Sequence, residues 1–275
     1  MLNRAQQAKA NLREWQAELH LIGRDQQTSD LPELRSFRGK DWDKRTHQDF
    51  DQRTRGVGGL YASCGEENLL DLPSDRYRGG SDICVHEFAH TVMEFGLDDA
   101  LRSDVAEQYR RATGAGLWSR LYAATNPREY WAELSMWYFG AHGHRGTTGP
   151  ADGGAALAAD DPVGYALLDR IYSGRLIPAA VTISPVHVVT ATGELHSFGG
   201  AGGAQLVLRN DSSRTFALRW LNFKGEPIDY GTLDPMSDRA MRTYLRHAWE
   251  LKDTVSGQIV RFVVEDSVSR WSVGE

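Results

Sequence analysis

Residues 82–95 read DICVHEFAHTVMEF, and this stretch decides how the first half of the chain is interpreted. Apolar residues at helical spacing predict one helix, with Ser81 as the expected N-cap and Gly96 just beyond its end. On such a helix His86 and His90 stand one turn apart on the same face, where they can share a metal ion. The pattern therefore predicts a zinc site, because zinc prefers imidazole nitrogen. The alternative is an amphipathic helix that happens to carry two histidines.

A second helix is expected to supply the third ligand. The segment NPREYWAE, residues 126–133, begins with an N-cap asparagine and a proline at the first helical position. Glu129 and Glu133 then share one helix face. Glu129 is the expected third zinc ligand, and Glu133 is expected to orient a histidine from behind. Glu87, beside the histidine pair, is the expected general base. The alternative for the two carboxylates is a solvated acidic face.

These two motifs resemble the gluzincin metallopeptidases of the anthrax lethal factor type, which combine HExxH with a later tyrosine, Thr-Asn and Glu-x-x-x-Glu arrangement. In this sequence HEFAH is followed further along by YAATNPREYWAE. The resemblance implies a zinc-dependent endopeptidase in which Tyr122 hydrogen-bonds the developing oxyanion. It also implies that Gly65–Leu70 forms an edge strand that binds substrate backbone. The implied site is formed by His86, His90 and Glu129 as ligands, Glu87 as base, Glu133 and Tyr122.

Two further pairs of metal-binding residue types lie near these motifs. His142 and His144 fall in a glycine-rich loop and are expected to be solvent-exposed, the alternative being contact with substrate or a second metal. Cys64 and Cys84 form either one disulfide or two buried thiols. A thiol that inhibits by binding zinc is a further alternative.

The character of the sequence changes after residue 178. Residues 1–178 read as mostly helical, residues 179–203 as a linker that ends in glycines, and residues 204–275 as short β-rich runs separated by turn signals. The expected fold class is α+β: a mostly helical zincin-type catalytic domain followed by a small all-β sandwich.

The C-terminal part resembles the β-domain of the von Hippel–Lindau family from about Gln205 onward. WLNFKGEPIDYGTL, residues 220–233, carries the resemblance together with His247 and Trp249. That family binds 4-hydroxyproline in a small pocket, and the matching residues here are Tyr230, Thr243, His247 and Trp249. Thr243 stands where the family has serine. The last three have the same parity on one expected strand, so they should face the same way. The alternative is a retained fold without the binding.

Composition limits the partners. The net charge is −6, which argues against nucleic acid and anionic membranes, and no apolar run is long enough to span a bilayer. The first residues are too polar for a signal peptide, so the protein either stays inside the cell or has lost its signal. Hydroxyproline-bearing targets would instead imply a secreted or extracytoplasmic protein.

Together these patterns favour a zinc-dependent endopeptidase whose β-domain grips hydroxyproline-containing substrates, such as collagen-like or plant cell-wall proteins. One alternative is a binding protein with an inactive zincin scaffold. Another is a narrowly specific toxin or effector protease whose β-domain serves only for docking to another ligand.

Overall fold

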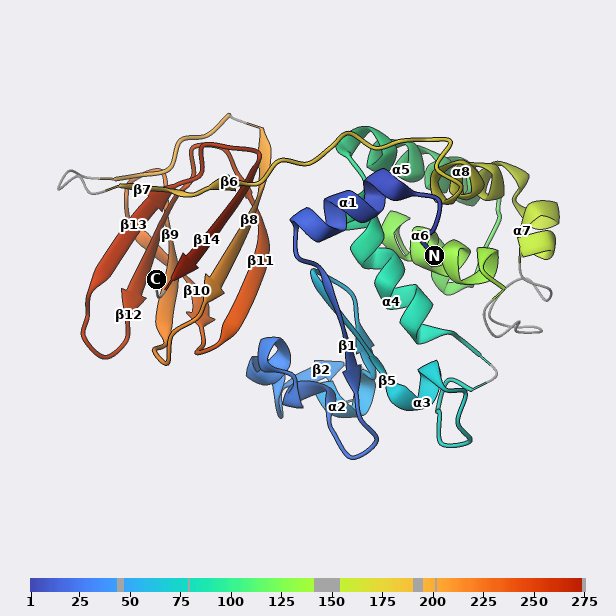
Figure 1. Cartoon of the computed structure of the whole chain (residues 1–275), viewed down its shortest axis with the longest axis horizontal. Helices are drawn as coiled ribbons and strands as arrows, with labels where there is room; N and C mark the ends of the chain where they lie inside the picture. Colours follow the sequence, from blue (N-terminus) through green and yellow to red (C-terminus); the bar gives the residue numbers. More distant parts are fainter. Residues whose placement is uncertain (44–46, 79, 141–153, 190–194, 201, 274–275) are drawn as a thin grey trace. The chain divides into compact units, whose positions relative to one another are not determined.

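A computed structural model describes residues 1–43, 47–78, 80–140, 154–189, 195–200 and 202–273 of the chain. The chain divides into two compact units, unit 1 (Met1–Val181) and unit 2 (Thr182–Glu275). Both helices and β-sheets are present, and the C-terminal unit is a β-domain (Figure 1). Among the described residues, no helix combines the length and apolar character that crossing a membrane requires.

Helices make up most of unit 1 (Figure 1). Its α-helices are α1 (Gln6–Glu14), α2 (Phe50–Arg53), α3 (Glu66–Leu69), α4 (Ile83–Thr91), α5 (Asp99–Gly114), α6 (Pro127–Tyr138), α7 (Gly154–Asp160) and α8 (Pro162–Tyr172). Short 3-10 helices span Thr28–Asp30, Pro32–Phe37 and Tyr122–Ala124, and a π-helical turn, Val92–Gly96, continues α4.

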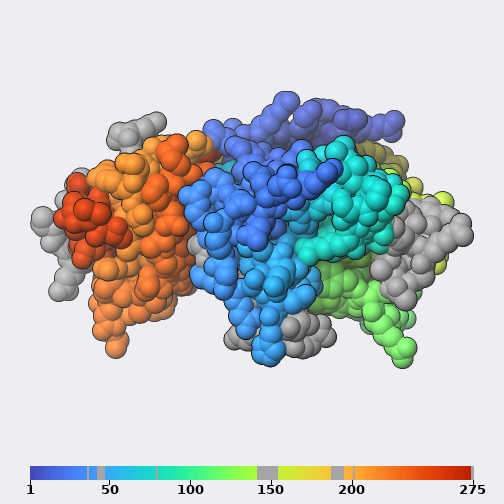
Figure 2. Space-filling view, turned by 90° about the horizontal axis from the view of Figure 1, so that it is seen from below, coloured from blue at the N-terminus to red at the C-terminus, as the bar shows by residue number. Residues whose placement is uncertain are grey.

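A small sheet completes unit 1. Its strand order is β1 (Glu18–Ile22), β5 (Tyr61–Gly65) and β4 (Gly56–Val57), with β1 parallel and β4 antiparallel to β5. A separate pair is formed by β2 (Asp41–Asp43) and β3 (Gln48–Asp49). The N-terminal segments, coloured blue to cyan, gather on the face of this unit that Figure 2 shows. Helix α4 packs on β5, which places the sheet beside the HExxH residues.

Packing between α4 and α6 fixes the relative position of the two motif helices. Trp131 of α6 is fully buried, and its indole N–H donates to the Ala89 carbonyl of α4 at 2.8 Å. The same ring stacks on Tyr172 of α8. Because a buried indole N–H needs an acceptor, this contact sets the register of α6 against α4.

Unit 2 is a sandwich of two sheets with an apolar interior. One sheet has the order β10 (Pro227–Leu233), β9 (Phe216–Leu221), β12 (Ala248–Asp253), β13 (Ile259–Val263) and β7 (His187–Val189). The other has the order β11 (Ser237–Tyr244), β8 (Gly203–Asn210), β14 (Val268–Val273) and β6 (Ser184–Pro185). Alternate residues such as Leu206, Leu208, Leu218 and Leu251 point inward, as the two-residue period of a strand requires.

The predicted start of the second motif helix is confirmed. Asn126 caps α6 by accepting from the backbone N–H groups of residues 128 and 129. The prediction for the HExxH helix was wrong at both ends. Asp82 rather than Ser81 is the N-cap and accepts from the Val85 N–H, and Gly96 is the last residue of the π-helical turn rather than the residue beyond it.

Other predictions about the chain's organisation were wrong. The segment assigned to a linker contributes β6 and β7 to the two sheets of unit 2, since such short strands carry no periodic signal. The glycine-rich loop was expected to run from Gly140 to Ala159, but its last residues, from Gly154 on, belong to α7. His142 and His144 lie outside the described residues. Gly65–Leu70 is not an edge strand, because Gly65 ends the central strand β5 and α3 follows it.

Candidate metal centre and candidate binding pocket

Three donor atoms from two helices converge in unit 1. The Nε2 atoms of His86 and His90 lie 3.2 Å apart, and Oε2 of Glu129 lies 3.2 Å from the first and 3.3 Å from the second. Both histidines are buried and Glu129 is half-buried. The structure thus brings together all three sequence-predicted ligands.

The spacing of these atoms fits a transition metal. Ligand bonds of about 2.0–2.1 Å at tetrahedral angles hold donor atoms about 3.3–3.4 Å apart, close to all three separations. Oε2 of Glu129 is buried and has no well-directed hydrogen bond among the described residues. Two imidazoles and a carboxylate are also the donor set of catalytic zinc sites that keep one position open. The residues therefore fit a zinc ion.

Glu133 lies behind His86, as its predicted role requires. Its Oε1 accepts from Nδ1 of His86 at 3.0 Å, and its side chain is nearly buried. With Nδ1 occupied as a donor, a neutral His86 presents a lone pair at Nε2, the atom that faces Glu129.

The ionisable groups of the site shift one another's pKa. Burial raises the pKa of Glu129, but contacts with His86 and His90 outweigh it and lower the pKa to about 2. Burial also lowers the pKa of His86, whereas Glu129 and Glu133 raise it to about 10. Burial raises the pKa of Glu87, although the two histidines act in the opposite direction. A carboxyl with a raised pKa is suited to taking and releasing a proton.

Tyr122 lies at the mouth of the same site. Its ring stacks on His86 with 6.2 Å between centroids, and it is 55% exposed. Burial, and next the negative charge of Glu129, raise the pKa of its hydroxyl, which therefore stays protonated and can donate a hydrogen bond.

A glycine segment that the sequence prediction missed lies against the HExxH helix. A Cβ added at Gly56 would come within 2.5 Å of Ile83, and one at Gly58 within 2.6 Å of His90. Gly58 donates its backbone N–H to the Glu87 carboxylate, and the Thr91 hydroxyl donates to the Gly59 carbonyl. Only glycine permits so close an approach. A two-residue strand has no periodicity, so spacing alone could not find it.

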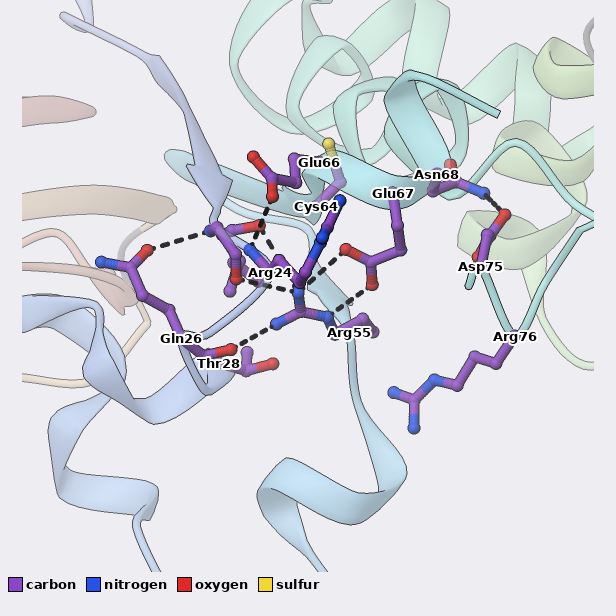
Figure 3. Close-up of polar contacts among 12 residues, drawn as sticks. Arg24, Gln26, Thr28, Arg55, Cys64, Glu66, Glu67, Asn68, Asp75 and Arg76 are labelled. Carbon is purple, nitrogen blue, oxygen red and sulfur yellow. Dashed lines mark hydrogen bonds and ion pairs between the residues drawn. The ribbon is translucent and has the colours of Figure 1, made fainter. Parts of the chain in front are cut away.

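The base of this segment is held by a part-buried ion pair (Figure 3). Arg55, which precedes β4, points its guanidinium at Glu67 of α3, with Nε–Oε1 and Nη2–Oε2 distances of 2.6 and 2.9 Å. A disulfide joins Cys64 of β5 to Cys84 of α4, so the alternative with two free thiols was wrong. The disulfide holds β5 to the first turn of the HExxH helix, and the ion pair holds the start of β4 to α3.

In unit 2 the four predicted pocket residues also come together. The Trp249 indole N–H donates to Thr243 Oγ1 at 3.2 Å, and His247 Nδ1 lies 3.4 Å from that oxygen. Tyr230 packs edge-on against Trp249, with 4.9 Å between centroids. Burial lowers the pKa of His247, which favours a neutral ring with one acceptor nitrogen. A hydroxyl, an imidazole and aromatic walls thus converge.

The reason given for this convergence was wrong. Thr243 is on β11 and Trp249 on β12, which belong to different sheets, and His247 lies in the turn between them. Arg246 adopts a φ of +66° in that turn. Tyr230 lies at a β-bulge, where the register of β10 shifts, and bulges re-aim side chains. The candidate pocket residues therefore gather where the chain passes from one sheet to the other.

Trp220 is a further aromatic residue of this cluster that sequence reasoning left unassigned. Its ring lies 5.2 Å from that of His247, and its buried indole N–H has no partner among the described residues. The sequence did contain a signal for this residue, because Trp220 is the first residue of the stretch WLNFKGEPIDYGTL that carries the family resemblance.

A hollow elsewhere on unit 2 contains none of the predicted pocket residues. Its Arg219 also contacts Glu250, at 3.5 Å, so we assign the hollow no role. The hollow is lined by Ala217, Arg219, Pro227, Asp229, Gly231 and Thr232.

Unit 2 is a β-sandwich in which Tyr230, Thr243, His247 and Trp249 lie close together. Residues 195–264 match the family model described as the VHL beta domain. The C-terminal resemblance is thereby confirmed for these residues, which are similar to the VHL beta domain, a substrate-recognition domain. Residues before 195 and after 264 lie outside the match.

Proposed function

We propose that this chain is a zinc-dependent endopeptidase whose β-domain binds hydroxyproline-containing protein substrates. The observation that carries the peptidase half is the convergence of His86, His90 and Glu129, with Glu133 behind His86. The VHL-type β-domain, with Thr243 and His247 facing each other beside Trp249, supports the binding half.

The ion would be held by His86, His90 and Glu129, and when bound it would polarise the substrate carbonyl and acidify a water molecule. Glu87 takes a proton from the attacking water and passes it to the leaving amine as the C–N bond breaks. The products are a carboxylate and an amine. Tyr122 donates a hydrogen bond to the substrate oxygen as negative charge develops on it. The Gly58 N–H holds the Glu87 carboxylate in place.

In unit 2 the hydroxyl of a hydroxyproline would meet Thr243 Oγ1 and His247, while its ring packs on Trp249 and Tyr230. A pocket built to pair that hydroxyl discriminates against plain proline, because its own polar groups would be left unpaired. Binding through a second module raises the local concentration of the chain to be cut. Such substrates imply a secreted or extracytoplasmic protein, and the Cys64–Cys84 disulfide suits an oxidising compartment.

Digestion of hydroxylated collagen-like peptides, with and without a chelator, tests the enzymatic half. We expect Glu87→Gln to keep its metal but to lose hydrolysis by about 100- to 10,000-fold, because its amide cannot accept the proton. Cleavage that is insensitive to both chelator and E87Q would refute the proposal. An intact metal site with no cleavage of any peptide would instead favour the binding protein.

A further inference from the structure

Three exposed aromatic side chains flank the candidate hydroxyproline pocket. Phe223 is 57%, Tyr244 56% and Phe198 44% exposed. We call these three residues the aromatic rim. Large aromatic side chains dominate interface energetics, so several exposed together mark a binding surface.

The rim is continuous with the pocket through His247. The His247 ring lies 5.1 Å from that of Tyr244 and 6.0 Å from that of Phe223. Trp220 meets Phe223 edge-on, with 5.4 Å between centroids. A ligand whose hydroxyproline enters the pocket must therefore place its neighbouring residues near these rings.

Phe198 is held beside the same turn. Its backbone N–H donates to the Arg246 carbonyl at 3.1 Å, and the Arg246 guanidinium lies 4.5 Å from its ring centre. A Cβ added at Gly199 would lie 3.7 Å from the Phe223 ring, so this loop borders Phe223. Phe198 is thus held in place by the turn that also carries His247.

The chemistry of this surface suits a proline-rich chain. Pyrrolidine rings pack on aromatic faces, and aromatic-lined grooves recognise polyproline II helices. Such a chain has no internal hydrogen bonds and offers mainly carbonyl acceptors. Around the candidate pocket the structure provides matching donors, namely the hydroxyls of the exposed Tyr230 and Tyr244.

We infer that the β-domain reads hydroxyproline within a proline-rich segment in polyproline II conformation, with flanking prolines packed on the aromatic rim. This inference rests on the proposed pocket and adds the class of sequence around the hydroxyproline. The extended polyproline II chain is rigid before binding, so little ordering cost opposes its capture.

Calorimetry with the full-length chain and three synthetic peptides tests the inference. One peptide carries a single hydroxyproline flanked by glycine and alanine, the second is flanked by prolines, and the third has proline in place of the hydroxyproline in the second. Phe223→Ala and Tyr244→Ala are compared with Val255→Ala, an exposed apolar residue in another turn of unit 2. Mass spectrometry checks that the peptides stay intact.

We expect the proline-flanked hydroxyproline peptide to bind tightest, with F223A and Y244A each weakening it by about three- to tenfold. V255A should bind it unchanged, and the glycine-alanine peptide should bind all four proteins alike. Equal affinity for the two hydroxylated peptides, or a flanking gain that survives F223A and Y244A, would overturn the inference while leaving the pocket intact. If the third peptide, which lacks the hydroxyl, binds as tightly as the second, the pocket does not recognise the hydroxyl and only the aromatic rim is supported. If no peptide binds, both the pocket and the aromatic rim are refuted.

Discussion

Nδ1 of His86 donates to Oε1 of Glu133 at 3.0 Å, while Nε2 of the same ring lies 3.2 Å from Oε2 of Glu129. The Glu133 carboxylate therefore orients the His86 ring, and the Glu129 carboxylate faces the other nitrogen of that ring. Both carboxylates come from one face of α6. Removing the orienting group should loosen the ring without removing a ligand.

Glu133→Ala should consequently weaken zinc binding by about 10- to 100-fold. Glu133→Gln should fall between wild type and E133A, because an amide oxygen can still accept from Nδ1. Competition with a chromophoric chelator measures both. Glu107→Ala, on the exposed face of α5, is the matched control. Wild-type affinity in E133A would show that Glu133 has no orienting role.

Tyr122→Phe should lower kcat by about 100- to 1,000-fold, the usual cost of one lost oxyanion donor. Metal content and KM should change little, because the ring and its contact with His86 remain. Steady-state kinetics on a cleaved peptide and metal analysis of the same preparation provide the check. If KM rises and kcat does not fall, Tyr122 binds substrate rather than stabilising charge.

Thr243→Val should weaken binding of hydroxyproline peptides and also destabilise unit 2. The Trp249 indole N–H would lose its acceptor in a buried place, at a cost of about 1–3 kcal/mol. Thr243→Ser keeps the hydroxyl and should retain both properties, and Thr232→Val on β10 is a control outside the pocket. Calorimetry and chemical denaturation report on them separately. Unchanged peptide affinity in T243V would remove Thr243 from the pocket.

The free energy of unfolding should fall as the pH rises through about 9, because of His20. The Glu33 carboxylate, 2.5 Å from Nδ1, is the largest influence; it and Glu18 raise the pKa of His20 from 6.5 to about 9 against the effect of burial. A group whose pKa is raised by folding stabilises the folded state fully at pH values below its unfolded pKa, here 6.5. That stabilisation is lost as the pH rises above the folded pKa, here about 9. Since His20 is partly exposed, the effect is modest. Denaturation of wild type and His20→Gln is to be measured below pH 6.5 and above pH 9. The two proteins should differ in unfolding free energy at the low pH, and the difference should vanish at the high pH.

Much of the metal centre could be predicted because its signals are local. The i, i+4 spacing of His86 and His90 and the Asn-Pro start of α6 follow from helix geometry. The packing of Trp131 on Ala89 then brings the two helices together. Glu129 was expected as the ligand and Glu133 as the orienting group, and the family resemblance gave the same assignment.

Features that depend on tertiary contact or on very short elements could not be predicted. Gly56 and Gly58 are glycines because α4 approaches them closely, which no neighbouring residue signals. The sheet change between Thr243 and Trp249 was missed because Arg246 occupies a left-handed position without glycine or asparagine to mark it. The strands β6 and β7 are too short for periodicity to reveal.

The metal content of purified wild type and Glu129→Ala, measured by mass spectrometry with E107A as control, tests the central claim most directly. We predict stoichiometric zinc in wild type and E107A, and its loss in E129A, because two imidazoles alone leave the ion without its third ligand. A wild-type protein without a stoichiometric transition metal, or an E129A variant that retains it, would contradict the account.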